Sequence, residues 1–387
     1  MAEALGGSSN IPNPRLTTAY SQWSSGSWGA LITGNILIDR HYLGGPADVC
    51  IDSPAHFESN LSAWKSYADA AQADGTPTIV QICHAGRQSP LGAGTRGMMA
   101  KNLAPSAVPV NIGDGWIASG ARSVLFGTPR EMTKEEIEDV VERFVVAAKG
   151  VEKAGFMGVE IHAAHGYLLS TFLTPNTNLR NDEYGGTPEK RTRIVIDIIN
   201  RIRDAIPQPF CIGIKLNSVD ASSSSLEDSL TQIRLLASTG IDFLEISGGS
   251  YEDPRMVGAS IHAPSESTKS REAYFLDYAE HVRKEFPELL LMVTGGFRTR
   301  VGMRDAVRKG ACDLVGIGRP ALVEPRLPVR LLDEKVPDEE ATLVLKSVPP
   351  GLLGKWVPVK VLGAGIEMQH WYKQMALMGQ GKPTIAP

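Results

Sequence analysis

The sequence predicts an α/β protein of the TIM (β/α)8-barrel type. Short apolar runs alternate with amphipathic helical periodicities over most of the 387 residues, and parallel strands need helical crossovers of this kind. An open doubly wound sheet is the competing architecture. It would favour a G-x-G-x-x-G turn, and no such turn follows any of the strand-like runs.

Seven apolar runs are predicted to form the strands of the sheet. Each is followed by a helical pattern or by a glycine-containing turn, as in repeated βα units. The runs cover residues 28–35, 76–86, 158–163, 210–217, 243–249, 289–296 and 313–320. Seven strands are one short of a complete eight-stranded barrel.

The clearest helix is predicted to begin at residue 133. Thr133 and Glu136 form a capping box, in which each side chain satisfies a backbone N–H of the first turn. From Ile137 to Ala148 the apolar residues keep to one stripe, as in a helix that packs on a sheet. Similar stripes predict helices over residues 188–206, 226–239, 271–286 and 299–309.

The chain divides into a barrel and a tail. Residues 1–334 are expected to form the barrel, with a long Gly- and Pro-containing loop at 85–130 above its strands. Residues 335–387 form a tail that contains one amphipathic stretch, IEMQHWYKQMALM. We expect this stretch to be a helix that packs on the barrel or on a partner subunit of a homo-oligomer.

Charge and composition exclude several classes of partner. The 39 basic and 43 acidic residues give a net charge of −4, so nucleic acid and anionic membranes are not expected as partners. The apolar runs are too short to cross a bilayer, and the first residues lack the basic and apolar regions of a secretory signal. Four scattered cysteines with no C-x-x-C pair favour reduced thiols in a cytoplasmic protein without an iron–sulfur cluster.

The last two strands end in residues suited to a phosphate. Gly295 and Gly296 follow one strand, and Gly318 and Arg319 follow the next. A single glycine pair after a strand is usually only a tight turn. Two such ends side by side, with an arginine, favour an anion site at the carboxyl edge of a barrel.

The earlier strands end in hydrogen-bonding side chains. An amide, imidazoles and a lysine can bind the polar edge of a flat heterocycle and polarise a carbonyl, although each residue alone would be weak evidence. These residues are Asn35, Gln81, His162, His165, Tyr167 and Lys215. The two histidines could also be metal ligands, but HAAHGY offers no carboxylate or thiol and H-E-x-x-H is absent, so no metal site is expected.

The segment that contains these histidines resembles the signature of the Old Yellow Enzyme family of FMN-dependent ene-reductases. The resemblance rests on VEIHAAHGYLLSTFLTPNTNLRNDEYGG, with QICHAGR, IKLNS, ISGG, VTGGFRT and GIGRP following in the family's order. It covers residues 15 to 330 and, more weakly, the segment HWYKQMALMGQGKP. LITGN is similar to the branch that includes NADH:flavin oxidoreductases of bacteria and fungi.

The resemblance implies the reduction of an activated C=C bond in an α,β-unsaturated carbonyl compound, with NADH or NADPH as reductant and a place in secondary metabolism. His162 and His165 would bind the substrate oxygen, Tyr167 would protonate Cα, and FMN would deliver a hydride to Cβ. The flavin would be bound by Gly34, Asn35, Gln81, Lys215, Gly249, Gly295, Gly296, Gly318 and Arg319.

One departure from the family leaves other interpretations open. Family members begin with a further few dozen residues, whereas MAEAL aligns with the end of their first strand. We therefore expect the barrel to be truncated in strand 1, and Ala2 stands where a flavin-bonding residue is common. A weakly flavin-binding paralogue without redox turnover and a flavin-dependent isomerase are the alternatives.

Overall fold

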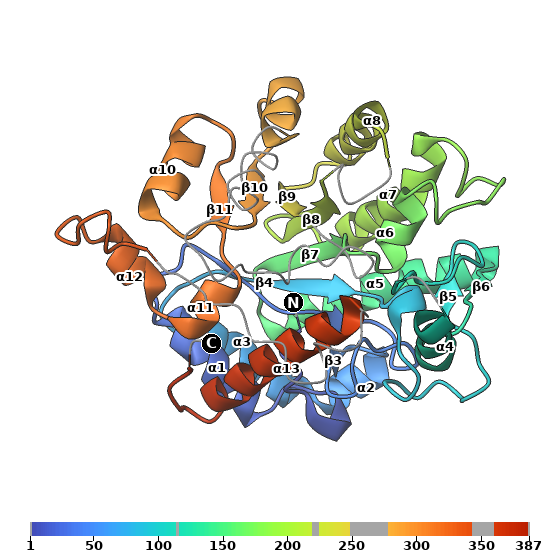
Figure 1. Cartoon of the computed structure of the whole chain (residues 1–387), viewed down its shortest axis with the longest axis horizontal. Helices are drawn as coiled ribbons and strands as arrows, with labels where there is room; N and C mark the ends of the chain where they lie inside the picture. The colour runs from blue at the N-terminus through green and yellow to red at the C-terminus, as the bar shows by residue number, and fades with distance from the viewer. Residues whose placement is uncertain (1, 114–115, 219–223, 248–277, 343–359, 386–387) are drawn as a thin grey trace.

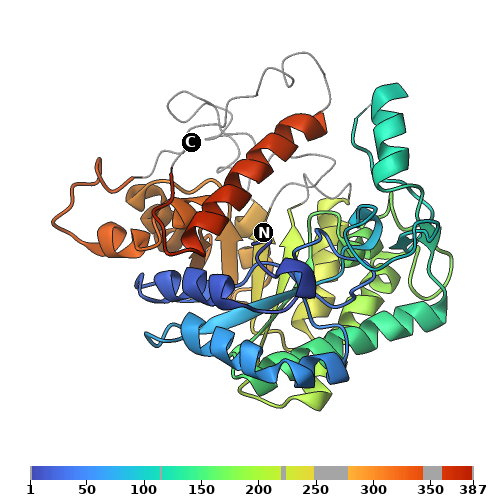
Figure 2. The same ribbon diagram turned by 90° about the horizontal axis from the view of Figure 1, so that it is seen from below.

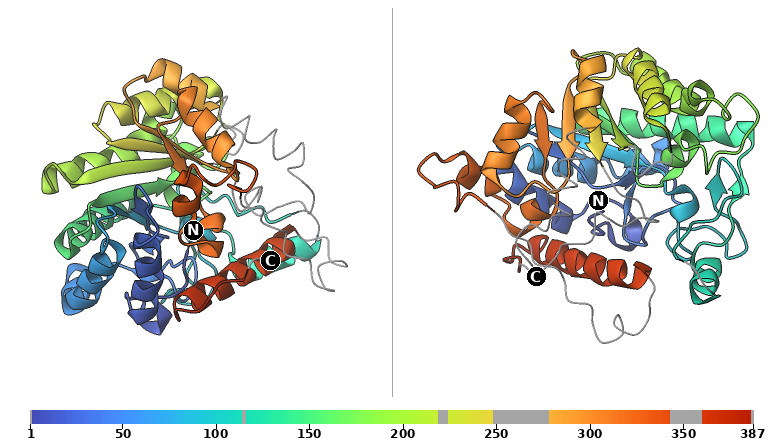
Figure 3. Two further views of the ribbon diagram at one scale, coloured as in Figure 1. Left: turned by 90° about the vertical axis from the view of Figure 1, so that its left-hand side faces the viewer. Right: turned by 45° about the horizontal axis from the view of Figure 1, so that its top comes forward.

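The computed structural model describes residues 2–113, 116–218, 224–247, 278–342 and 360–385. Its main strands form a curved parallel sheet with helices along the outer side (Figures 1 and 3). All seven predicted runs are confirmed as strands: β1 Leu31–Ile32, β4 Thr78–Cys83, β7 Gly158–Ala163, β8 Cys211–Asn217, β9 Phe243–Ser247, β10 Leu291–Thr294 and β11 Leu314–Gly316.

The order of the strands is that of a βα barrel. The sheet runs β11-β10-β9-β8-β7-β4, and β1 pairs with β4. Neighbours in sequence are therefore neighbours in space, without the reversal that defines a doubly wound sheet. Two short strands, β2 (Ile36–Leu37) and β3 (Val49–Cys50), continue the sheet beside β4. Within the described ranges no strand joins β11 to β1.

Several strands are shorter than predicted. A side chain binds the next backbone N–H, or a glycine turns the chain away from the neighbouring strand. Thr33 still donates its N–H to Ile79 at 3.0 Å, but Gly34 donates to the Glu3 carboxylate at 2.7 Å, which ends β1. β10 ends before Gly295, and Gly296 has a left-handed φ of 68°. The predicted end of the 243–249 run lies partly outside the described residues.

The helices largely follow the predicted stripes. α5 (Lys134–Ala154) has the capping box of Thr133 and Glu136, and it ends at Gly155 with φ 96°. α7 (Pro188–Ala205), α8 (Leu226–Ala237) and α10 (Arg300–Arg308) confirm three further predictions. Of the predicted 271–286 helix, residues 271–277 lie outside the described ranges and 278–285 are helical. Further helices are η1 Gly7–Ser9, α1 Pro14–Ser24, α2 Pro54–Ser59, α3 Leu61–Ala71, α6 Leu168–Leu173, α11 Arg319–Val323 and α12 Leu327–Leu332.

The strands separate an apolar layer from a polar interior. Val159 and Ile161 of β7 are fully buried in the hydrophobic core shared with the helices. Glu160 and His162 alternate with them and therefore face the other side of the sheet, although they are equally buried. An interior that holds charged and polar side chains is unusual for a barrel, where branched apolar residues dominate.

The 85–130 loop has a fixed base and an exposed outer part. It contains η2 (Gly86–Gln88), β5 (Leu103–Ala104), α4 (Trp116–Leu125) and, at its end, β6 (Arg130–Glu131). The buried Asn102 amide donates to the carbonyls of Arg87, Ser89 and Phe126 at 2.9–3.2 Å. Figure 2 shows α4 projecting from the body of the molecule, with Trp116 85% exposed.

Arg180 fastens this loop to the polar segment after β7. Its guanidinium donates to the carbonyls of Met132 at 2.7 Å and Pro105 at 3.3 Å, and to the carboxylate of Asp182 at 2.6 Å. The side chain is 5% exposed. The polar loop TPNTNLRNDEYGG therefore anchors the neighbouring excursion through buried, charge-assisted hydrogen bonds.

The tail returns to the N-terminal part of the barrel. α13 (Lys360–Met378) contains the predicted amphipathic stretch and contacts α1 and α11. Gln22 of α1 donates to the Met378 carbonyl at 2.7 Å, and Met375 and Met378 are buried. In the part of the chain that the structure describes, no helix has the length and apolar character needed to cross a membrane.

Replacing Arg180 by Lys tests this anchor. Lysine cannot reproduce the planar fork of bonds, so we expect Arg180→Lys to lower the free energy of unfolding by about 2 kcal/mol. Arg193→Lys is the matched control, because the Arg193 side chain is 53% exposed and its ion pair with Asp197 is long, at 3.8 Å. Urea unfolding should show a change within about 0.5 kcal/mol for the control. Equal effects in the two variants would contradict the anchoring role of Arg180.

Candidate active site

The register of the parallel strands brings the predicted site residues to one edge of the sheet. His162 of β7 lies beside Lys215 of β8, and Lys215 lies beside Glu245 of β9. Gln81 of β4 is in register with Glu160, one pleat below His162. The carboxyl ends of these strands therefore form one polar cluster, as expected for a barrel of this type.

The two histidines are hydrogen-bonded to each other. His162 Nδ1 accepts the N–H of Ala164 at 3.2 Å, so the proton of the neutral ring is on Nε2. That nitrogen lies 3.2 Å from His165 Nδ1, which leaves the proton of His165 on Nε2, 3.2 Å from the Ser247 hydroxyl. Burial lowers the pKa of His162 well below its usual range, and His165 and Lys215 lower it further. His162 is therefore a neutral hydrogen-bond donor at neutral pH.

The backbone of His165 is held in a left-handed conformation with φ 60°, which is costly for a residue other than glycine. The Asn217 side chain accepts the N–H of His165 at 3.0 Å, and the Gln88 amide donates to its carbonyl at 2.9 Å. Gly166 follows with φ 75°, and a Cβ there would overlap the Gln88 amide. Two buried amides thus fix the direction of the imidazole.

Tyr167 lies against the histidine pair at the start of α6. Its ring is 4.9 Å from that of His162, nearly perpendicular to it at 84°. The Asn35 amide donates to the phenol oxygen at 3.2 Å. This bond uses a lone pair of the oxygen and not its proton, so Tyr167 keeps a proton to donate.

Two of the buried amide oxygens that have no hydrogen-bond partner within the described ranges belong to the predicted flavin-binding set. They are Asn35 Oδ1 and Gln81 Oε1, and both side chains are less than 5% exposed. Gln81 Nε2 donates to the Thr33 carbonyl at 3.3 Å, which turns its oxygen away from that carbonyl. Unsatisfied acceptors are costly in a native interior, so this edge of the sheet is suited to a ligand with N–H donors.

Lys215 forms a buried ion pair with Glu245, at 2.6 Å between Nζ and Oε1. Burial alone would lower the pKa of Lys215, but the charge of Glu245 outweighs it and raises the pKa. Burial would raise the pKa of Glu245, and Lys215 lowers it in turn. The site therefore holds a charged ammonium whose counter-charge comes from the next strand.

The glycine-rich ends of β10 and β11 lie side by side. Thr294 is in register with Gly316, where a Cβ would overlap the threonine hydroxyl. Gly295 and Gly296 follow the first strand, and Gly318 and Arg319 begin α11 after the second. These four predicted phosphate-binding residues are thus neighbours.

Two glycines of the predicted flavin-binding set have other surroundings. The Gly34 N–H is occupied by Glu3, whose carboxyl fills the space beside Gly34, and by the Tyr20 hydroxyl at 3.0 Å. Gly249 lies outside the described residues.

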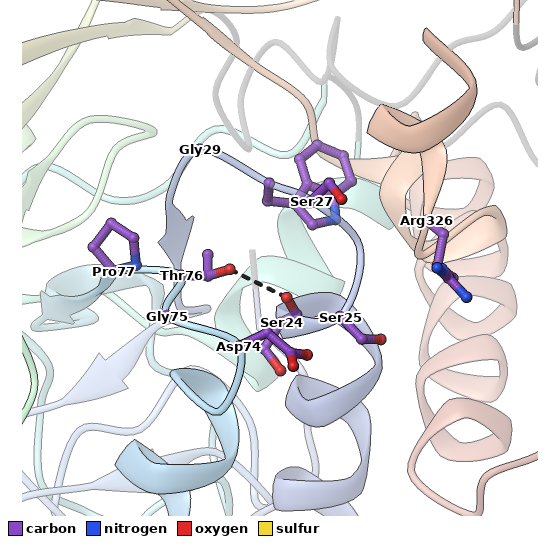
Figure 4. Close-up of a pocket in the computed structure, with 10 residues that line it drawn as sticks. Ser24, Ser25, Ser27, Gly29, Asp74, Gly75, Thr76, Pro77 and Arg326 are labelled. Atoms are coloured by element: carbon purple, nitrogen blue, oxygen red, sulfur yellow. Dashed lines mark hydrogen bonds between the residues drawn. The ribbon is translucent and has the colours of Figure 1, made fainter. Parts of the chain in front are cut away.

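A surface pocket lies at the opposite ends of the strands (Figure 4). Its lining residues precede β1 and β4, except for Arg326 from the segment before α12. Thr76 donates its hydroxyl proton to the Ser24 carbonyl there at 3.1 Å. Because catalytic groups of a barrel gather at the carboxyl ends of its strands, this pocket is separate from the candidate active site.

Sequence reasoning missed the residues that support the site. Asn217 and Gln88 hold His165, and Glu160 and Glu245 surround Lys215. The two glutamates left a readable signal, because each is a charged residue in the middle of an otherwise apolar strand, GVEIHA and FLEIS. The two amides left none, because their role depends on the turn that His165 makes.

Comparisons with known proteins show the family of the chain. The model of the NADH:flavin oxidoreductase / NADH oxidase family matches residues 6–339. The chain is 43% identical over 346 residues to the NADH-dependent flavin oxidoreductase iliE of Hypocrea jecorina (strain QM6a), covering 89% of this chain and 86% of that protein. It is 41% identical over 331 residues to the NADH-dependent flavin oxidoreductase iccE of Talaromyces variabilis, covering 85% and 80%.

A solved structure shares the fold. The Old Yellow Enzyme homologue from Zymomonas mobilis superposes with a TM-score of 0.68 at 23% identity, covering 94% of this chain and 92% of that one. The family match and these relatives define a flavin-dependent oxidoreductase, and the solved structure shows that its fold is a TIM-type barrel. The chain belongs to the NADH:flavin oxidoreductase / NADH oxidase family, and it shares its fold with the Old Yellow Enzyme homologue. FMN is its cofactor and a nicotinamide its reductant.

Replacing Asn217 by Leu tests the support of His165. The substitution leaves the buried N–H of His165 without an acceptor, so we expect a loss of about 1–3 kcal/mol in the free energy of unfolding. Asn200→Leu, the same change at an exposed position of α7, is the control and should cost less than about 0.5 kcal/mol. Urea unfolding measures both. An Asn217→Leu protein as stable as the control would contradict the clamp.

Proposed function

We propose that this enzyme reduces the activated C=C bond of α,β-unsaturated carbonyl compounds, with NADH or NADPH supplying the electrons. The observation that carries the proposal is the grouping of two imidazoles and a tyrosine hydroxyl at one strand edge. Neutral donors can stabilise negative charge on a carbonyl oxygen, and the phenol can supply a proton to the neighbouring carbon.

The residues present fit FMN. The unsatisfied oxygens of Asn35 and Gln81 would accept from an N–H of the flavin ring, and the Lys215 ammonium would face its N1/C2 carbonyl edge. Gly295, Gly296, Gly318 and Arg319 would hold the phosphate, and Gly249 would complete this set. FMN, when bound, supplies the hydride for Cβ of the substrate.

His162 and His165 would bind the substrate oxygen by exchanging partners. Each ring carries its proton on Nε2, where it now donates to His165 Nδ1 and to the Ser247 hydroxyl respectively. A carbonyl oxygen between the rings would receive both bonds. These bonds strengthen as charge develops on the oxygen, so they favour the transition state over the bound substrate.

Tyr167 would donate the proton to Cα as a general acid. The Asn35 amide orients the phenol and stabilises the oxygen as its proton leaves, because an N–H donor binds a phenolate more strongly than a phenol. This role requires the Tyr167 hydroxyl to lie near Cα of the substrate, since the hydride goes to the adjacent Cβ. Tyr167 and His162 lie in contact, as such a division of labour needs.

Tyr167→Phe should separate the two half-reactions. Removal of the general acid should slow alkene reduction by about 10²–10⁴-fold and leave flavin reduction by the nicotinamide close to the wild-type rate. Stopped-flow absorbance of the flavin measures each half-reaction. The matched control is Tyr184→Phe, outside the strand ends, which should leave both rates unchanged. An equal loss in both half-reactions of Tyr167→Phe would rule out the proton-donor role.

His162→Ala should weaken the binding of a phenol, which imitates the charged oxygen of the substrate. The loss of one buried donor predicts a rise in Kd of about tenfold or more, read from absorbance titration of the flavin. His56→Ala on α2 serves as the control, with an expected Kd unchanged from the wild type. Unchanged phenol affinity in His162→Ala would contradict the oxygen-binding role.

A further inference from the structure

The barrel interior below the histidine pair contains a lysine and two carboxyl groups. Lys215 of β8 is 2.6 Å from Glu245 of β9, and Glu160 projects from β7 on the other side of β8. Exposed fractions are 0% for Glu160, 7% for Lys215 and 2% for Glu245. An unpaired charge away from water is very costly. The stability of this buried cluster therefore depends on how many of its three groups are ionised.

The contacts of the two carboxyl groups differ. Glu245 has the ammonium of Lys215 as its partner, whereas neither oxygen of Glu160 accepts a hydrogen bond from any described residue. An ionised carboxylate without donors is not stable in such a site. A neutral carboxylic acid is stable there, because its O–H can donate a hydrogen bond. Glu245 lies on the same face of the sheet on the other side of β8, where Gly213, the residue in register with Glu160, has no side chain to separate them. Its carboxylate is therefore the acceptor available to Glu160.

We propose that Glu245 is the ionised residue that positions the Lys215 ammonium for FMN, and that Glu160 is a neutral acid that holds Glu245 by donating a hydrogen bond to it. The cluster then contains one positive charge, one negative charge and one carboxylic acid proton. Its relevance to FMN rests on the proposed function, because Lys215 is the residue assigned there to the flavin ring.

Neighbouring groups agree with this arrangement. The repulsion of Glu245 adds to burial in raising the pKa of Glu160 well above its usual range. Gln81, the residue of β4 in register with Glu160, does not titrate. Among the residues that the structure describes, the titratable groups around Glu160 are Glu245 from β9, Lys215 and Cys211 from β8, and His162 from its own strand. Burial raises the pKa of Cys211 to about 12, and His162 is neutral, so neither supplies a competing charge.

The neutral state of Glu160 can be tested without FMN turnover. In the unfolded chain this carboxyl ionises above its ordinary pKa of 4.5, whereas in the folded chain it keeps its proton. The unfolded state therefore binds fewer protons, and the wild type must lose stability as the pH rises from that value toward the raised pKa. Glu160→Gln has no proton to lose, and its amide can still donate to Glu245.

The first experiment compares wild type and Glu160→Gln in urea unfolding of the full chain between about pH 5 and about pH 8. We expect the midpoint of Glu160→Gln to rise relative to that of the wild type across this range. A constant difference, or a loss relative to the wild type toward high pH, would overturn the assignment of the proton. Because Glu160→Gln is isosteric and keeps the charge balance, it should fold even if variants of Glu245 do not.

The second experiment measures FMN affinity by fluorescence quenching. Glu245→Gln removes the counter-charge, so Lys215 turns toward Glu160 and FMN binding should weaken by about tenfold. Glu160→Gln keeps a hydrogen-bond donor toward Glu245, so it should weaken FMN binding much less than Glu245→Gln does. In a Lys215→Met background, Glu245→Gln should cause no further loss, because Glu245 acts through the lysine.

The outcomes separate this inference from the proposed function. If Lys215→Met leaves FMN affinity unchanged, the lysine does not face the flavin and that part of the proposed function fails, as does the role of Glu245 toward FMN. If Lys215→Met weakens binding but Glu245→Gln does not, the positioning role alone is overturned. Equal losses in Glu160→Gln and Glu245→Gln would overturn the division between an ionised and a neutral carboxyl.

Discussion

The parallel pairing of β7 with β8 is the constraint on which the site depends. In the observed register His162 lies beside Lys215. The residues that alternate with them along each strand face the apolar core. A slip of one residue would turn Val159 and Ile161 into the polar interior and Glu160 and His162 toward the helices. The apolar contacts of α5 and α7 therefore fix the alignment of the polar groups, although they touch none of the chemistry.

Burial then gives these polar groups their protonation states. The same loss of water that keeps His162 neutral keeps Glu160 protonated, so a base and an acid both lose their charge for one physical reason. Lys215 and Glu245 stay charged because each has the other within 2.6 Å. The interior thus supplies neutral hydrogen-bond donors and one fixed charge pair below them.

The order of the elements was readable from the sequence because periodicity reports burial. All seven strand runs and the capping box of Thr133 and Glu136 are present, and the limits of β7 agree residue by residue. Strand length was less predictable, as β1 shows, because Glu3 takes the N–H of Gly34 from far along the chain. The grouping of His162, His165 and Tyr167 followed from their spacing. The support of His165 by Asn217 did not, since it depends on a left-handed turn that no local pattern specifies.

The 85–130 loop combines a rigid base with an outer part that carries few constraints. Asn102 closes the base by joining three backbone carbonyls, and Arg180 ties its far side to the segment after β7. Changes in the outer part of the loop, along α4, are therefore not expected to move the strand ends. A stretch attached in this way works as an exchangeable cassette: its length and side chains can diverge, or be replaced by design, while the histidines and the tyrosine below keep their geometry.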